Sequence, residues 1–199
     1  MRIIVLSDTH QYYRNFETIV LRHPDADMFI HLGDGESEYQ LLCRNMPEVA
    51  DKFRYIKGNC DYGSEAPLTQ TIDLMPGHRV FATHGHRYRV NSTLDYLEQA
   101  ALEEGCDIAL YGHTHVSQCT YENGIYVMNP GSASCPRDGN PPSPVVSWVK
   151  SSWERSYRKS AFLWYPGRFQ RRCHDQCGVP GDKNTVLTVS FHSMQQSTF

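Results

Sequence analysis

Histidine, aspartate and asparagine recur at five places where a short apolar run ends. The clearest case is "GHTH", in which His113 and His115 follow the apolar run "DIALY". We call each of these places a strand exit. Four earlier exits, "SDTH", "GDGE", "GNCD" and "THGH", supply Asp8, His10, Asp34, Asn59, His84 and His86. Glycine lets the backbone turn sharply at such exits, and α/β proteins build their sites in loops at the carboxyl ends of sheet strands. The pattern predicts a single site to which all five exits contribute.

The donor types indicate a transition-metal site. Imidazole, carboxylate and amide oxygen donors suit Mn, Fe, Zn or Ni better than the all-oxygen cages of calcium or the thiolate cages of structural zinc. Two aspartates with four or five histidines exceed what one tetrahedral ion can use, so we expect two ions, with one carboxylate bridging them at about 3.5–4 Å. Such a pair activates a water molecule and holds both oxygens of an in-line displacement at phosphorus. Hydrolysis of a phosphate ester is therefore the expected chemistry.

Each motif by itself has an ordinary explanation, because Asp, Asn and Gly are common turn residues. Only the ordered set of five favours a metal site. Glu36 and Asp61 lie two residues after the ligand positions Asp34 and Asn59, and we expect them to be solvated turn residues, with the orienting of a neighbour as the alternative. His31 either packs in the core or supports the site from behind.

The elements that must position these exits are short. Near-continuous apolar runs at residues 2–6, 27–32, 53–57, 79–83, 107–111 and 125–129 predict strands buried on both faces. Helical patterns occupy residues 12–23, 37–46 and 91–105, with Ser37 and Ser92 as expected caps, and Pro76-Gly77 predicts a hairpin. Strands alternating with helices predict an α/β or α+β layered sheet.

The composition is that of a globular chain. It has 199 residues, 40% of them hydrophobic, and a formal net charge of −3, which indicates neither a nucleic-acid nor a membrane partner. The seven cysteines are odd in number and lack C-x-x-C spacing, which argues against a disulfide framework and a structural zinc knuckle. The first apolar run is too short for a signal peptide, and no window reaches the ~18 apolar residues of a membrane span. We expect a soluble, cytoplasmic protein.

The charge is divided unevenly along the chain. Residues 1–149 hold 11 Lys+Arg and 19 Asp+Glu, a net charge of −8, whereas residues 150–199 hold 8 and 3, a net charge of +5. We therefore divide the chain into a domain at 1–149 and a basic, aromatic-rich extension at 150–199. The extension is a lineage-specific addition, the product of a changed reading frame, or a nucleic-acid-stacking surface. The first two are favoured, because the apolar pattern is lost after "PVVSWVK".

The ordered set D-x-H, G-D, G-N, G-H and G-H-x-H, spread over residues 8–115, resembles the calcineurin-like metallophosphoesterases. "GNCD", "THGH" and "GHTH" in so short a chain are similar to the small YfcE-type phosphodiesterase branch, and the resemblance covers about residues 1–143. The phosphoesterase-like subunit of retromer shares that fold. The resemblance implies a four-layer α/β/β/α sandwich with the metals at one edge.

The resemblance also implies a ligand set. One metal would be held by Asp8, His10, Asp34 and His115, and the second by Asp34 as the bridge with Asn59, His84 and His113. A metal-bridging hydroxide would attack phosphorus, in a phosphodiester rather than a phosphomonoester. His86 would contact the phosphate or support a ligand. Cys60 stands where many members of the superfamily carry a histidine that protonates the leaving group, and a cysteine nucleophile is disfavoured because no basic partner is identifiable.

The expected cofactors are two divalent metal ions, Mn²⁺ foremost, with Ni, Fe, Co or Zn as alternatives. The expected partner is a small phosphate-ester substrate, with no membrane partner, nucleic acid disfavoured and a homo-oligomer left open. The rival function is a metallophosphoesterase-like scaffold that binds protein partners and has lost turnover. The presence of every expected ligand favours an enzyme.

Overall fold

The computed structural model describes residues 1–75, 77–139, 146–149 and 189–191. Its strands form two five-stranded sheets, in the orders β10-β9-β1-β2-β3 and β4-β5-β6-β8-β7. The strands of the first sheet are β1 (Arg2–Leu6), β2 (Met28–His31), β3 (Phe53–Tyr55), β9 (Val146–Val149) and β10 (Val189–Phe191). Those of the second are β4 (Thr69–Met75), β5 (His78–Thr83), β6 (Ile108–Leu110), β7 (Ser117–Glu122) and β8 (Ile125–Pro130).

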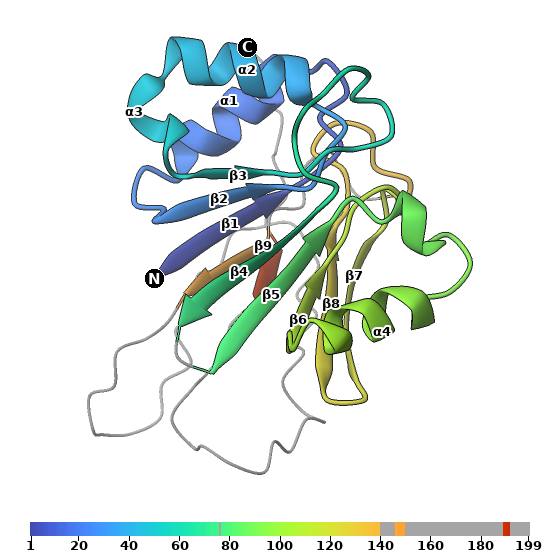
Figure 1. The fold of residues 1–199 in the computed structure, drawn as a ribbon. Coiled ribbons are helices and arrows are strands. Elements are labelled where there is room, and N and C mark those ends of the chain that lie inside the picture. The colour runs from blue at the N-terminus through green and yellow to red at the C-terminus, as the bar shows by residue number, and fades with distance from the viewer. Residues whose placement is uncertain (76, 140–145, 150–188, 192–199) are drawn as a thin grey trace, which may run out of the picture.

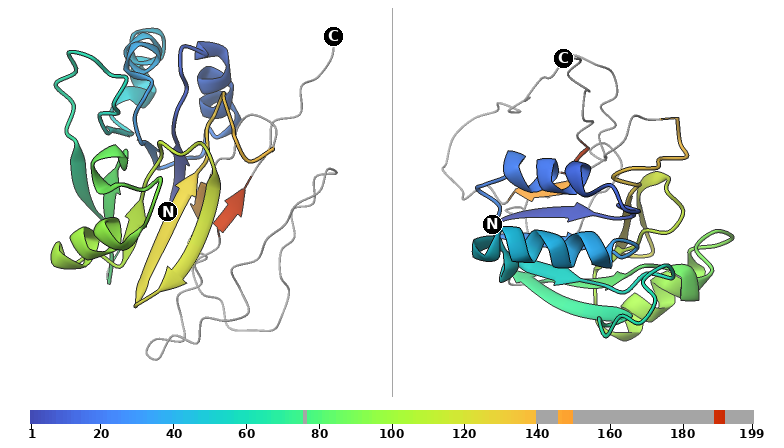
Figure 2. Two further views of the ribbon diagram at one scale, coloured as in Figure 1. Left: turned by 90° about the vertical axis from the view of Figure 1, so that its right-hand side faces the viewer. Right: turned by 90° about the horizontal axis from the view of Figure 1, so that it is seen from above.

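Helices cover the outer face of each sheet. The first sheet carries α1 (Tyr13–Arg22), α2 (Glu36–Asn45) and α3 (Pro47–Ala50). The second carries α4 (Asp95–Glu103) and the 3₁₀ turn η1 (His86–Tyr88). Seen from two further directions, the sheets lie face to face between these helices (Figure 2). The predicted four-layer α/β/β/α sandwich is confirmed.

Successive side chains of a strand point to opposite faces of its sheet, and the buried ones form three apolar clusters. In β1, Ile3 and Val5 belong to the cluster between the sheets, whereas Ile4 and Leu6 pack with Phe16 of α1 on the other face. The four apolar side chains of β1 are fully buried. This explains why the run reads as continuously apolar, and it confirms the prediction that the strand is buried on both faces.

Parallel pairing brings the strand exits to one end of the sandwich. Strands β1, β2 and β3 are mutually parallel, as are β5, β6 and β8 (Figure 1). The carboxyl ends of neighbouring parallel strands share one edge of a sheet. The predicted hairpin is confirmed as the antiparallel pair β4–β5.

Two predicted helix caps are wrong. Helix α2 begins at Glu36 after Gly35, so Ser37 lies inside the first turn. Helix α4 begins at Asp95 after Leu94, and the Asp95 N–H donates to the Thr93 hydroxyl rather than to Ser92 (3.2 Å). Strand β7 was not predicted. None of its side chains is fully buried, so it carries no apolar run for the sequence to display.

Most of the extension at 150–199 and its three interpretations lie outside the described residues. Within them, β9 pairs antiparallel with β1, and β10 pairs antiparallel with β9. The division of the chain at residue 149 stays a prediction. No helix among the described residues is long and apolar enough to cross a membrane.

Candidate metal centre

The structure brings the five exits together at one end of the two sheets. The predicted site residues follow five strands in turn: Asp8 and His10 after β1, Asp34 after β2, Asn59 and Cys60 after β3, His84 and His86 after β5, and His113 and His115 after β6. Residues more than 100 positions apart are in contact here, since the Nε2 atoms of His10 and His115 lie 3.0 Å apart.

The first cluster of donors consists of Asp8, His10 and His115, whose ligand atoms lie within 4.8 Å of one another. Asp8 Oδ1 lies 3.1 Å from His115 Nε2 and 3.6 Å from His10 Nε2. This oxygen is buried and accepts no hydrogen bond from any described residue. A buried carboxylate oxygen without a donor is costly unless a cation faces it. The cluster therefore fits a metal ion.

The second cluster is built around Asp34 and His84. Asp34 Oδ2 lies 3.4 Å from His84 Nε2 and 3.9 Å from His10 Nε2, so this carboxylate faces both clusters. His84 Nε2 also lies 3.0 Å from Asn59 Oδ1. Two groups of donors with a shared carboxylate between them is the arrangement that a pair of ions requires.

His113 lies beside the second cluster. Its ring centroid is 5.2 Å from that of His84, and its main-chain N–H donates to Asp8 Oδ2 (3.1 Å). Its Nε2 is 3.0 Å from the side-chain amide of Asn91. Asn91 was missed by the sequence reading, because it comes from the loop between η1 and α4 and carries no motif or spacing signal.

Main-chain carbonyls set the tautomers of two histidines. Nδ1 of His84 lies 2.7 Å from the carbonyl oxygen of Leu32, and Nδ1 of His115 lies 2.7 Å from that of Cys135. Each Nδ1–H donates to a carbonyl, which leaves Nε2 as a lone-pair donor pointing into the site. A carbonyl partner has no residue-specific signature, so these contacts could not be predicted from the sequence.

The backbone is strained at the predicted ligands. Five of the seven have positive φ: Asp8 (57°), His10 (42°), Asp34 (58°), His113 (67°) and His115 (60°). Such angles are uncommon outside glycine and cost on the order of 1–3 kcal/mol each, and they cluster at functional sites. The fold thus maintains unfavourable main-chain geometry to aim these side chains.

The glycine of "GHTH" is required by a close approach. A Cβ atom on Gly112 would lie 2.0 Å from Ser7 Oγ and 2.8 Å from Asp8 Oδ2. No side chain can be accommodated where the exit of β6 passes the exit of β1. The glycine lets His113 and His115 reach Asp8.

The carboxylates stay ionised in spite of their burial. Burial by itself would raise the pKa of Asp8, but its contacts with His10 and His115 lower the pKa below the usual range. Burial would likewise raise the pKa of Asp34, but His84 and the Cys60 N–H lower it to about 2. Two anionic carboxylates in a buried site favour the binding of cations.

The histidines divide into two groups. The nearby Asp8 carboxylate raises the pKa of His10, and the contact with Asp34 raises the pKa of His84 against the effect of burial. Burial lowers the pKa of both His86 and His113. His10 and His84 each lie within 4 Å of a carboxylate oxygen, at 3.6 Å from Asp8 and 3.4 Å from Asp34.

Cys60 and His86 lie beside the donor clusters. Cys60 is exposed as a residue, but its sulfur falls within 4.8 Å of donor atoms of His10 and Asp34. Partial desolvation of the sulfur, together with the nearby charge of Asp34, raises the pKa of the thiol to about 11. The thiol is therefore protonated at neutral pH, which disfavours a thiolate nucleophile. The His86 ring lies 5.5 Å from that of His84, and its buried Nδ1 has no hydrogen-bond partner among the described residues.

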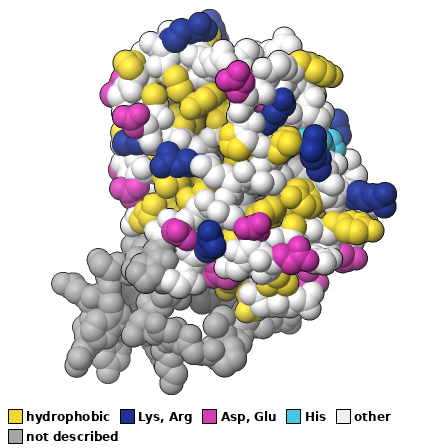
Figure 3. Space-filling view, in the orientation of Figure 1, with side chains coloured by type: hydrophobic (Ala, Val, Ile, Leu, Met, Phe, Trp, Pro, Cys, Tyr) yellow, Lys and Arg dark blue, Asp and Glu magenta, His cyan; other side chains and the backbone are white. Residues whose placement is uncertain are grey.

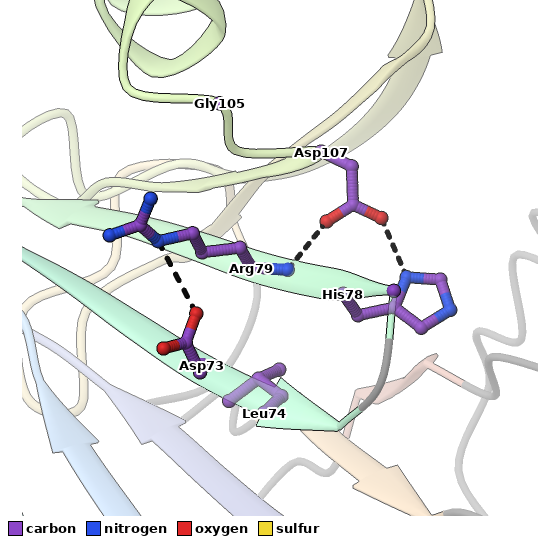
Figure 4. A pocket seen from close by; sticks show the side chains of 7 residues that line it. Asp73, Leu74, His78, Arg79, Gly105 and Asp107 are labelled. Atoms are coloured by element: carbon purple, nitrogen blue, oxygen red, sulfur yellow. Dashed lines mark hydrogen bonds and ion pairs between the residues drawn. The ribbon is translucent and has the colours of Figure 1, made fainter.

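A hollow of about 500 Å³ lies at the other end of β5, away from these donors. In its lining, His78 Nδ1 lies 2.6 Å from an Asp107 carboxylate oxygen, and Arg79 pairs with Asp73 (Figure 4). All four side chains are engaged with one another or with main chain. The hollow contains none of the predicted site residues, so the donor clusters rather than the cavity mark the chemistry.

Known proteins share both the sequence pattern and the fold. The model of the calcineurin-like phosphoesterase superfamily domain matches residues 1–152. The probable metallophosphoesterase YsnB of Bacillus subtilis is 31% identical over 139 residues, which is 69% of this chain and 78% of YsnB. The phosphodiesterase YfcE of Escherichia coli is 33% identical over 111 residues, which is 51% of this chain and 55% of YfcE.

Solved structures agree on the fold. YfcE superposes with a TM-score of 0.54 at 24% identity, over 74% of this chain and 87% of YfcE. Vps29 of Entamoeba histolytica, solved with Zn²⁺, gives a TM-score of 0.60 at 21% identity, over 75% of this chain and 86% of Vps29. Together with the ordered donors at five strand exits, these matches show that the chain belongs to the calcineurin-like phosphoesterase superfamily.

Proposed function

We propose that this chain is a dinuclear metal-dependent phosphodiesterase that hydrolyses a small phosphate ester. The observation that carries the proposal is the position of Asp34, whose Oδ2 faces His84 at 3.4 Å and His10 at 3.9 Å. Membership of the superfamily supports the broader class, a metal-dependent phosphoesterase.

The proposed ligands form two overlapping sets. One metal would be held by Asp8, His10, Asp34 and His115, and the other by Asp34, Asn59, His84 and His113. Two bound divalent ions would supply Lewis-acid activation of water and neutralise charge on the phosphoryl oxygens. We propose Mn²⁺ foremost, with Ni, Fe, Co or Zn as alternatives, because the mixed imidazole, carboxylate and amide donors suit all of these.

The chain itself holds these donors in fixed orientations. His84 and His115 keep Nε2 free because their Nδ1–H groups donate to carbonyls. Asp34 keeps Oδ2 free because its Oδ1 accepts the Cys60 N–H at 2.7 Å. Such pre-orientation lowers the reorganisation required when substrate binds.

The raised pKa of the Cys60 thiol supports a proposal about the leaving group of the substrate. A thiol with a pKa of about 11 is a poor proton donor for a departing alkoxide at neutral pH. We propose that the enzyme favours esters with good leaving groups. His86, whose buried Nδ1 has no partner among the described residues, is the proposed side chain for contacting the phosphate.

The direct test is the hydrolysis of bis-p-nitrophenyl phosphate by the purified protein, with added Mn²⁺ and then with chelator. We expect release of nitrophenol that requires the metal and stops with chelation. Absence of turnover with Mn²⁺, Ni²⁺, Co²⁺ and Zn²⁺, in folded protein that binds metal, would instead favour the scaffold that binds protein partners. The fold shared with Vps29 keeps that second candidate in view.

Nucleic acid is the less favoured partner. On the face drawn in Figure 3, lysine and arginine side chains are interspersed with acidic and hydrophobic ones rather than gathered into a stripe. Residues 1–149 carry a net charge of −8. A backbone-tracking surface requires concentrated positive charge.

A further inference from the structure

The carboxylate of Asp61, in the loop that follows β3, accepts hydrogen bonds with both of its oxygens. Only 7% of Asp61 is exposed, so the expectation that it solvates a turn is wrong. It accepts five hydrogen bonds: to Oδ1 from the N–H groups of Gly35 (3.0 Å) and Glu36 (3.1 Å), and to Oδ2 from the N–H groups of Asp34 (2.9 Å) and Gly58 (2.7 Å) and from the Tyr55 hydroxyl (2.9 Å).

These donors belong to two different strand exits. Asp34, Gly35 and Glu36 follow β2 and open helix α2, whereas Gly58 and Asp61 itself follow β3. The N-cap residue Gly35 has no side chain that could satisfy the first N–H groups of α2, and Asp61 accepts two of the hydrogen bonds there instead. One carboxylate thus ties the exit of β2 to the exit of β3.

The loops that follow β2 and β3 approach each other closely at Gly58. A Cβ atom on Gly58 would lie 2.0 Å from Asp34 Oδ1 and 2.4 Å from Asp34 N. The space between these loops therefore admits no further side chain. Asp61 reaches their donors from one side, with Tyr55 bonded to it there.

The consequence falls on Asp34. Its φ of 58° is unfavourable for an aspartate. Its own N–H donates to Asp61 Oδ2, and its Oδ1 accepts the Cys60 N–H at 2.7 Å. With both groups held, the remaining oxygen Oδ2 faces His10 and His84.

We propose that Asp61 is a positioning residue that holds the Asp34 carboxylate between the two donor clusters, so that both metal ions can bind it at once. The inference rests on the proposed dinuclear function. It concerns a residue outside the proposed ligand set, whose carboxylate accepts the main-chain N–H groups of residues 34–36 and 58.

The variant Asp61→Asn tests this role, because asparagine offers one acceptor oxygen where aspartate offers two and turns an NH₂ group toward main-chain N–H donors. We would titrate wild type and variant with Mn²⁺ alone, counting bound ions, and record electron paramagnetic resonance spectra of the loaded proteins. Wild type should bind two ions and give an exchange-coupled spectrum. Asp61→Asn should bind Mn²⁺ at least about tenfold more weakly and lose the coupled signal.

Asp107→Asn is the matched control. Asp107 also accepts a main-chain N–H, that of Arg79 at 2.8 Å, and pairs with His78, but it lies at the opposite end of β5 (Figure 4). We expect this variant to lose stability without any change in Mn²⁺ affinity or coupling. The comparison separates general destabilisation from loss of positioning.

Tyr55→Phe provides a second, milder perturbation. It removes the hydroxyl that donates to Asp61 Oδ2 and accepts the Gly35 N–H at 3.0 Å. We expect Mn²⁺ binding about threefold or more weaker, with a diminished coupled signal. If Asp61→Asn does not fold, this variant decides the question.

The outcomes separate the two proposals. A wild-type protein that fails to bind two Mn²⁺ ions overturns the dinuclear function, and the role of Asp61 with it. A wild-type protein that binds two ions, with folded Asp61→Asn showing the same affinity and coupling, overturns only the role of Asp61. Unchanged binding and coupling in Tyr55→Phe, where Asp61→Asn is unfolded, overturns that role in the same way.

Discussion

The carboxylate of Asp34 has its two oxygens in different surroundings. Oδ1 is held by the Cys60 N–H, whereas Oδ2 faces His84 and His10. Asp34→Asn replaces the proposed anionic bridge with a neutral amide of nearly the same shape. We expect activity to fall to background and bound metal to drop from two ions toward one, measured by turnover and metal analysis of the same preparation. Retention of both would sink the ligand assignment.

The thiol of Cys60 tests which group acts as the nucleophile. Burial and the nearby charge of Asp34 raise its pKa to about 11, so little thiolate is present at neutral pH. We expect Cys60→Ser to retain turnover within about tenfold of wild type, because a metal-activated water would not need the sulfur. Complete loss of activity in a folded, metal-loaded variant would restore the cysteine as nucleophile.

Strand β2 ends at His31, which belongs to a buried hydrogen-bonded chain with Thr9 and Glu38. His31 Nδ1 accepts the Gly33 N–H (3.1 Å), Nε2 lies 3.3 Å from Thr9 Oγ1, and that hydroxyl donates to Glu38 at 3.0 Å. This pattern needs a neutral imidazole with the proton on Nε2. His31 is fully buried, as core packing predicts. It also contacts Thr9, the neighbour of the predicted ligand Asp8, as the alternative of supporting the site predicts.

Burial lowers the pKa of His31 from 6.5 to about 4, which gives stability a pH dependence. Between these values the unfolded chain takes up a proton that the folded protein excludes, so the free energy of unfolding falls as pH drops from about 6.5 toward 4. The expected loss is about 1.4 kcal/mol for each full pH unit of that window. Denaturant melts of wild type and His31→Gln at several pH values should show a shallower slope in the variant, and identical slopes would contradict the assignment.

On the scale of the whole molecule, the layer between the sheets determines stability and the strand exits determine chemistry. Leu110 is fully buried in that layer, at the end of β6 just before "GHTH". We expect Leu110→Ala to lower the free energy of unfolding by about 2–5 kcal/mol. Leu102→Ala, at a side chain that is 47% exposed, is the control and should change it by less than about 0.5 kcal/mol. Equal effects in denaturant melts would show that the layer is not the core.

The local pattern of the chain was sufficient for much of the architecture. Apolar runs predicted β1, β2, β3, β5, β6 and β8, because burial on both faces leaves a continuous run in the sequence. Half-buried β7 left no such run and was missed. The cap at Ser37 was wrong because α2 begins one residue earlier, where the N–H groups of Gly35 and Glu36 donate to Asp61, 26 and 25 residues further along the chain. The cap at Ser92 was wrong because α4 begins at Asp95, whose N–H donates to Thr93.

By itself, the sequence determined which donor types stand at which strand exits and in what order, because glycines, aspartates and histidines at the end of an apolar run are a local signal. Only the tertiary structure decided that Asp34 faces two clusters, that Asn91 contacts His113, and that Asp61 joins two exits. These relations depend on strand order and register, which bring distant loops within hydrogen-bonding distance. They depend as well on main-chain N–H and C=O groups, which are the same in nearly every residue and therefore leave no trace in the sequence.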